Sequence, residues 1–227
     1  MEEVWIPLAA SVAALFLTVI VAGFLQHAAL RFLPSVSADG TPGAPIPASL
    51  FLVRALSTQC GLLIPALLAV GAFPGRIRLR MSASEMRTCV AGCGLVLAAN
   101  VAGSFAVRGA GEAYTGLPAL PRDGPGIAAI LATTVVSAPA VEELFFREAL
   151  LSRIFAPWTR PLALAASSLA FGALHAGVGG PVALATLSLI GLALGWIRER
   201  TGSLGAAIAV HAANNVFALL IAGLGSS

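Results

Sequence analysis

The chain has 227 residues, of which 58% are hydrophobic and only 10% are charged. So apolar a composition over this length excludes a soluble globular domain and predicts a polytopic membrane protein. The formal net charge is +3, and every basic residue is an arginine, spread over short connecting segments. Because the sequence contains no basic run, it gives no support to nucleic-acid binding, and the lipid bilayer is the expected surrounding.

Seven charge-poor segments are predicted to be membrane helices. A hydrocarbon layer near 30 Å requires about 20 residues of helix. We therefore predict an all-α fold, a bundle of about seven transmembrane helices in a single domain over residues 1–227. The predicted spans are Val4–Leu25, Ala55–Phe73, Thr88–Val107, Gly126–Phe155, Pro161–Ala176, Pro181–Ile197 and Leu204–Leu224.

The arginines predict how the helices are oriented in the membrane. If seven spans alternate, the arginines between spans two and three, four and five, and six and seven share one side. By the positive-inside rule this side is the cytoplasm, which also places the N-terminus inside and the C-terminus outside. The arginines concerned are Arg76, Arg78, Arg80, Arg87, Arg153, Arg160, Arg198 and Arg200.

Charged residues within the fourth span need an explanation. A charge near the bilayer centre costs roughly 2.5–3.5 kcal/mol on insertion scales, so buried carboxylates usually mark a working site. Glu143 precedes Arg147 by four residues, which allows an ion pair along one helix face. Glu142 points about 100° away and lacks such a partner. A carboxylate in that position can accept a proton from water, so Glu142 is the predicted general base and Glu143 and Arg147 are supporting residues.

Two later spans carry polar residues that are also one helical turn from a partner. These pairs are Phe171 with His175, and His211 with Asn215. Counted from the expected cytoplasmic boundary, Glu142 and His175 lie at about 22 and 21 Å, and His211 and Asn215 at about 10 and 16 Å. Helix tilt reduces the difference in depth between these two pairs of residues, so all four can form one buried cluster.

The cluster predicts hydrolysis of a carbonyl compound. A neutral His175 can bind the water or protonate a leaving amine, and His211 and the Asn215 amide can donate hydrogen bonds to an oxyanion. Asn214 is an alternative to Asn215, but only Asn215 is one turn from His211. We expect Phe171 to pack or to wall the site.

Other polar residues are expected to lie outside this cluster. Glu148 and Glu199 are interpreted as solvated or headgroup-level charges. Gln59 and Asn100 are interpreted as isolated polar residues with no constellation around them.

Three motifs in order resemble one known family. They are Glu142-Glu143-x3-Arg147, Phe171-x3-His175 and His211-x3-Asn215, within about the last hundred residues. This pattern is similar to that of the CPBP family (CAAX protease and bacteriocin-processing, also called abortive-infection) of intramembrane glutamate endopeptidases. Helices one to three carry no specific resemblance. The expected catalytic core is therefore about 126–225.

The resemblance implies roles for the same residues. Glu142 and His175 would activate water, His211 and Asn215 would form the oxyanion hole, and no metal or cofactor would be required. Eukaryotic members cut prenylated CAAX proteins. The arginine-only basic set and the Ala and Gly bias here are typical of a GC-rich bacterium. We therefore expect a bacterial cytoplasmic-membrane protease whose substrate is a peptide or a membrane-anchored protein.

Two other functions stay open at this stage. Glu142, His175 and His211 can also supply the three protein ligands of an open zinc site, which would make the protein a metallopeptidase. A non-catalytic scaffold, an immunity protein or a small transporter can use the same cluster for binding or proton coupling.

Overall fold

The computed structural model describes residues 48–72, 75–112, 124–175 and 179–224, together with Ala9 and Ala13. Its regular elements within these ranges are all helical, which confirms the predicted all-α class. The predicted span Val4–Leu25 lies outside the described residues except for those two. The elements are α2 (Ala48–Ala72), α3 (Ala83–Gly109), α4 (Gly124–Ile130), η1 (Leu131–Ser137), α5 (Ala138–Glu143), η2 (Leu144–Ile154), α6 (Arg160–Leu174), α7 (Pro181–Thr201) and α8 (Leu204–Leu224).

Five helices are long and apolar enough to cross a membrane, and one of them is the continuous helix 124–154 formed by α4, η1, α5 and η2. The apolar helix α6 has only 15 residues. Its length is about 22 Å, which is shorter than a hydrocarbon layer. The predicted segment Pro161–Ala176 is therefore confirmed as a helix to within two residues, but it is not among the helices long enough to cross the membrane, and it ends before His175.

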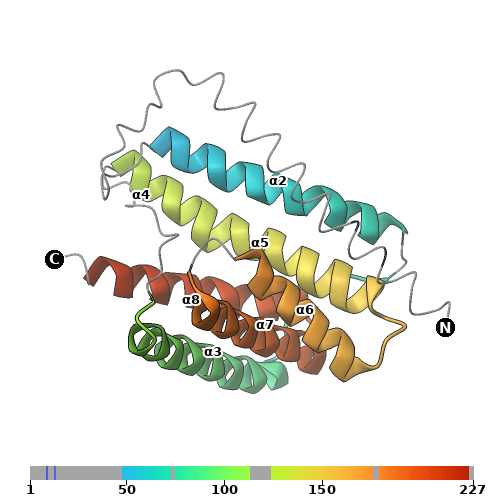
Figure 1. Ribbon diagram of the computed structural model, residues 1–227. Helices are drawn as coiled ribbons and strands as arrows, with labels where there is room; N and C mark the ends of the chain where they lie inside the picture. The colour runs from blue at the N-terminus through green and yellow to red at the C-terminus, as the bar shows by residue number, and fades with distance from the viewer. Residues whose placement is uncertain are drawn as a thin grey trace.

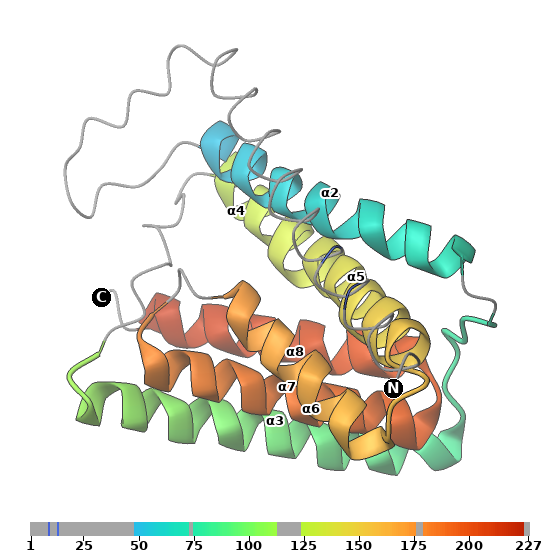
Figure 2. The same ribbon diagram turned by 45° about the vertical axis from the view of Figure 1, so that its right-hand side comes forward.

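The described helices form two layers (Figures 1 and 2). In the described part of the chain, α2 packs only along the helix 124–154, whereas α7 lies between α3 and α6 in the other layer. The helix α8 contacts both layers. Close approach of α3 and α7 depends on glycines: a Cβ on Gly103 would collide with Thr186, and one on Gly92 would collide with Ile197.

The helix 124–154 is not a regular α-helix. Two stretches, η1 and η2, have π-helical hydrogen bonding, in which each N–H donates to the carbonyl five residues earlier. Ala138 donates to Thr133 in this way, and Phe155 donates to Leu150. π-helical turns are rare and occur frequently at functional sites. The Glu142-Glu143 pair lies between these two stretches.

A buried charge cluster joins the segments at one end of the bundle, on the right in Figure 1. Glu148 accepts hydrogen bonds from Arg153 (Nη2–Oε1 2.8 Å) and from Arg198 (Nη2–Oε2 2.9 Å). Only 3% of the Glu148 side chain is exposed, so the expectation of a solvated Glu148 is wrong. Glu199, in contrast, is exposed as expected. Two arginines stabilise the buried Glu148 carboxylate, which the sequence interpretation had left without a partner.

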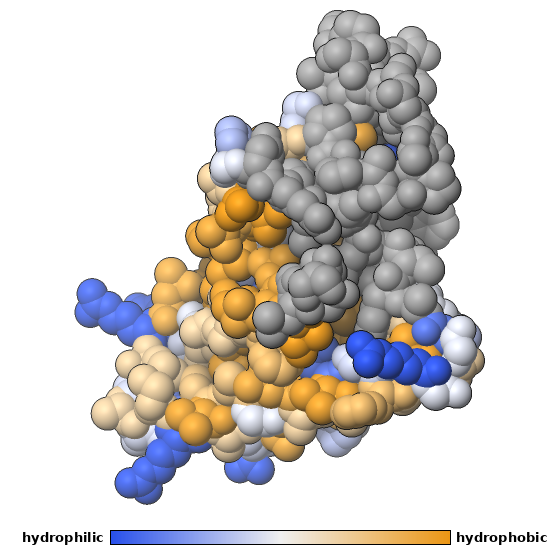
Figure 3. Space-filling model, turned by 90° about the vertical axis from the view of Figure 1, so that its left-hand side faces the viewer, coloured by the Kyte–Doolittle hydropathy of each residue, from blue (hydrophilic) through white to orange (hydrophobic). Residues whose placement is uncertain are grey.

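The same end gathers the connecting segments that carry the predicted cytoplasmic arginines. Leu204 donates its N–H to the Arg78 carbonyl (2.7 Å), and Arg160 pairs with Glu199 (3.3 Å). Figure 3 faces the opposite end, where apolar side chains dominate the middle of the face and hydrophilic ones lie toward its margins. Apolar side chains are also exposed on the helices, including Val90, Phe105 and Leu169. This distribution suits a protein surrounded by lipid.

Replacing Glu148 with alanine is expected to destabilise the fold by about 3–5 kcal/mol, because two arginines lose a buried counter-charge. The matched control is Glu199→Ala, which removes an exposed pair and is expected to cost at most about 1 kcal/mol. Unfolding of both variants in detergent, followed by circular dichroism, measures the difference. Equal, small losses for the two variants would contradict a structural role for the buried cluster.

Candidate active site

The predicted ion pair between Glu143 and Arg147 is present and fully buried. Glu143 Oε2 lies 2.9 Å from Arg147 Nε, and neither side chain has exposed area. Arg147 Nη1 also donates to Ser167 Oγ (3.2 Å), and Ser167 Oγ donates to the Phe146 carbonyl (2.8 Å). The guanidinium carbon lies 5.3 Å from the centre of the Phe171 ring, within range of a cation–π contact. The pair is therefore held by groups on two helices.

His211 connects α8 to this pair. Its Nδ1 lies 2.9 Å from Glu143 Oε1, and a carboxylate paired with arginine accepts, so His211 Nδ1–H is the donor. The imidazole Nε2 then faces Glu142, 3.8 Å from its Oε2. Glu143 thus fixes both the ring orientation and the tautomer of His211.

His175 is positioned by the end of α6. It is the C-cap residue of that helix, and its Nδ1 lies 2.8 Å from the Phe171 carbonyl. A carbonyl only accepts, so the Nδ1–H donates and satisfies one of the last carbonyls of the helix. His175 Nε2 points toward Glu142, 4.0 Å from its Oε2. The four-residue spacing from Phe171 to His175 therefore sets the tautomer and direction of this histidine.

Phe171 lies between the two histidines. Its ring centroid is 4.8 Å from that of His175 and 5.7 Å from that of His211. The helices α6 and α7 approach closely here, because a Cβ on Gly191 would lie 3.2 Å from Phe171, and one on Gly172 would meet Ser188. Phe171 packs against both imidazoles and limits their rotation.

Glu142 is the point on which the histidines converge. Its Oε2 is buried and has no hydrogen-bond partner among the described residues. The side chain is 14% exposed, and the Nε2 atoms of His175 and His211 both face that oxygen. Separations of 3.8 and 4.0 Å are too long for direct hydrogen bonds and fit groups that share a water molecule or a substrate atom.

Asn215 makes its contact away from Glu142. Its Nδ2 donates to the Thr134 carbonyl in η1 (2.8 Å), and within the described ranges no hydrogen bond or ion pair joins it to Glu142. The neighbouring Asn214 accepts from Asn100 Nδ2 (2.8 Å), so the expectation of an isolated Asn100 is wrong. α8 therefore presents His211 and Asn215 to two places on the helix 124–154, and Asn214 to α3.

Sequence reasoning missed Ser167. It lies four residues before Phe171 and eight before His175, so helical periodicity places all three on one face of α6. This four-residue spacing is the sequence feature from which Ser167 could have been identified as a site residue. The contact of Ser167 with Arg147, in contrast, follows from packing of α6 on η2, which no local pattern reports.

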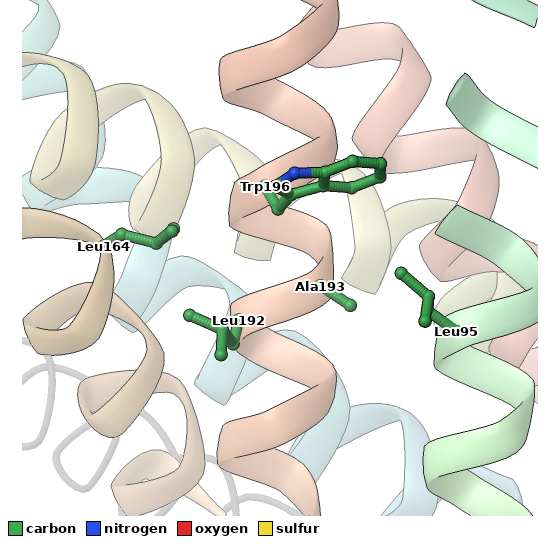
Figure 4. Close-up of a pocket in the computed structure, with 5 residues that line it drawn as sticks. All are labelled: Leu95, Leu164, Leu192, Ala193 and Trp196. Atoms are coloured by element: carbon green, nitrogen blue, oxygen red, sulfur yellow. The ribbon is translucent and has the colours of Figure 1, made fainter. Parts of the chain in front are cut away.

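Among the described residues, no group of three His, Cys, Asp or Glu side chains is arranged to hold a metal ion. A pocket of about 310 Å³ lies elsewhere, between α3, α6 and α7 (Figure 4). Its lining is apolar and contains none of the residues above. The residues that line it are Leu95, Leu164, Leu192, Ala193 and Trp196.

The fold and this site define an integral membrane protein with a carboxylate–histidine cluster buried among its helices. Residues 124–217 match the family model described as type II CAAX prenyl endopeptidase Rce1-like. This region is thus similar to the CPBP family, and the match supports an intramembrane CAAX-protease-type function. The searches of curated proteins and of solved structures gave no match.

Replacing Arg147 with methionine is expected to destabilise the protein by about 3–5 kcal/mol, because it removes the buried partner of Glu143. Adding Glu143→Gln to that variant should recover part of the loss, since the uncompensated charge disappears. The control Glu142→Gln is expected to change stability by less than about 1 kcal/mol. Unfolding in detergent measures all three variants. A Glu142→Gln loss as large as that of Arg147→Met would contradict the separation of the two carboxylates.

Proposed function

We propose that the protein is a metal-independent intramembrane glutamate endopeptidase that hydrolyses a peptide bond of a membrane-associated peptide or protein. One observation carries this proposal: the buried, unpartnered Oε2 of Glu142 faces the Nε2 atoms of His175 and His211 at 4.0 and 3.8 Å. A carboxylate left without a donor beside two imidazoles is suited to proton transfer. The proposed catalytic core is about 126–225.

In the first step, Glu142 takes a proton from a water molecule while the water oxygen attacks the carbonyl carbon of the peptide bond. His175 helps Glu142 to position this water molecule. Its Nδ1–H is committed to the Phe171 carbonyl, so the neutral ring has its lone pair on Nε2, where it can accept a hydrogen bond from the same water. Water and substrate together form a tetrahedral intermediate with a negatively charged oxygen.

His211 and Asn215 are the proposed donors to that oxygen. Because Nδ1–H of His211 is donated to Glu143, the ring presents an N–H at Nε2 only as an imidazolium. The Glu143 carboxylate stabilises that cation. Asn215 uses one Nδ2 hydrogen for Thr134, and the second remains for the oxyanion. Donors held in a low-dielectric site stabilise developing charge strongly.

Collapse of the intermediate breaks the carbon–nitrogen bond. The leaving amine takes the proton that Glu142 removed from water, either directly or through His175 Nε2, and a carboxylic acid and an amine are released. Glu142 returns to its carboxylate form, so the cycle consumes one water and requires no other reactant.

The substrate and location are proposed as follows. The protein would lie in a bacterial cytoplasmic membrane with its arginine-rich end, which carries Arg78 and Arg160, in the cytoplasm. The substrate would be a peptide or a membrane-anchored protein. Because the matching family model is described as a CAAX prenyl endopeptidase, a prenylated CAAX peptide should be tested as a substrate together with unmodified peptides.

Comparison of membrane proteomes tests the activity. Cells carrying Glu142→Gln or His175→Ala are expected to accumulate the same one or few proteins with an uncut terminus, at unchanged enzyme level. The physical reason is that each variant removes a group that handles the proton of water, which usually costs about 10²–10⁴-fold in rate. Terminal-peptide mass spectrometry is the measurement.

Two outcomes of that comparison would change the assignment. Normal processing in Glu142→Gln together with a defect in Glu143→Gln, at equal protein level, would move the base role to Glu143. Normal processing in every variant would replace the peptidase with a scaffold, immunity protein or transporter.

A chelator separates the glutamate mechanism from a zinc mechanism. Cleavage by the purified protein in detergent is expected to persist after dialysis against a strong zinc chelator, because water activation is assigned to Glu142 and His175 alone. Loss of cleavage that added zinc restores would instead make Glu142, His175 and His211 metal ligands. The control is a known zinc peptidase treated in parallel.

A further inference from the structure

A proline interrupts the hydrogen bonding of the helix that carries Glu142. In η1, N–H groups donate five residues back, and the last such bond runs from Ala138 to the Thr133 carbonyl. The next donor in this register would be residue 139, which is a proline and has no N–H. Ala138 already donates to Thr133, so neither the π-helical nor the α-helical donor position offers an N–H to the Thr134 carbonyl.

Asn215 supplies the missing donor. Its Nδ2 lies 2.8 Å from the Thr134 carbonyl, although the two residues are 81 positions apart in the chain. Asn215 is one turn from His211, which binds Glu143. Two hydrogen bonds therefore join α8 to the helix 124–154, one on each side of Pro139.

Gln59 holds the same turn from the opposite layer. It lies on α2, is 8% exposed, and its Nε2 lies 3.3 Å from the Thr133 carbonyl. The expectation that Gln59 is isolated is therefore wrong. Figures 1 and 2 show α2 and α8 on either side of the helix that contains η1. Adjacent carbonyls are thus bound by amide side chains from two helices.

This turn determines the direction of Glu142. A π-helical turn contains one more residue than an α-helical turn, so its conversion to α-helix rotates everything beyond it by about 100°. Glu142 lies eight residues after Thr134. Such a rotation would turn its carboxylate away from His175 and His211.

We propose that Pro139, Asn215 and Gln59 form a register lock: the proline frees the Thr134 carbonyl, and the two amides hold the π-helical turn that directs Glu142 at the histidines. Asn215 and Gln59 are in this sense positioning residues, and Gln59 lies outside the region that matches the family model. The consequence for catalysis rests on the proposed function. The register lock itself does not depend on the proposed function, because hydrogen bonds of the protein without substrate define it.

Hydrogen–deuterium exchange of the full-length protein in detergent tests the lock through a double-mutant cycle. Asn215→Leu is expected to speed amide exchange over residues 131–143 about tenfold, because it leaves a carbonyl unpaired. In a Pro139→Ala background the effect should fall to about twofold or less, because residue 139 then donates to Thr134. The matched control Asn214→Leu, on the same helix, should leave this segment unchanged. Equal acceleration by Asn215→Leu in both backgrounds would overturn the proposal.

Gln59 provides a second, independent measurement. Gln59→Met keeps the volume but removes the donor, and is expected to speed exchange over the same residues several-fold. Gln59→Glu should restore protection at acidic pH, where the neutral acid donates an O–H, and lose it at higher pH, where an ionised oxygen faces the carbonyl. A response independent of pH would overturn the role of Gln59. Because exchange needs no substrate, failed processing in the proteomic comparison would refute the peptidase and leave the lock standing.

Discussion

The two oxygens of Glu143 organise the site. One binds Arg147 and the other binds His211, so a single buried carboxylate joins η2 to α8. Ser167 and Phe171 then hold the guanidinium from α6. Removing either Glu143 or Arg147 leaves an unpaired charge in a low-dielectric interior, and this penalty favours the observed pairing over other arrangements. The position of His211 relative to Glu142 follows from this arrangement.

The shortness of α6 brings His175 to the same place. A full span would have carried its last residue toward the far membrane surface, whereas the 15-residue helix ends within the bundle. Its unpaired terminal carbonyl then becomes useful, because His175 caps it through Nδ1 and turns Nε2 toward Glu142. The end of a helix thereby positions a candidate catalytic group, with Phe171 packed between the two imidazoles.

Sequence patterns predicted the helices and the contacts within one helix, and missed contacts between residues far apart in the chain. Apolar runs located the described helices, and the four-residue spacing of Glu143 and Arg147 predicted their ion pair. Glu148 was misjudged because its charge is balanced by Arg198, 50 residues away. Asn215 was grouped with His211 by helical spacing, yet its amide binds Thr134. Spacing reports a shared face but not which groups of the neighbouring helices that face meets.

The adjacent glutamates acquire opposite properties because donors are distributed unequally between them. Glu143 has strong donors on both oxygens, so it is stabilised as an anion and is unsuited to accepting a proton. Glu142 Oε2 has no donor within the described ranges and lies beside two imidazole nitrogens. A rotation of about 100° separates the two side chains on the helix. The register of that helix, set at Thr133 and Thr134, therefore decides whether Glu142 faces the Nε2 atoms of both histidines.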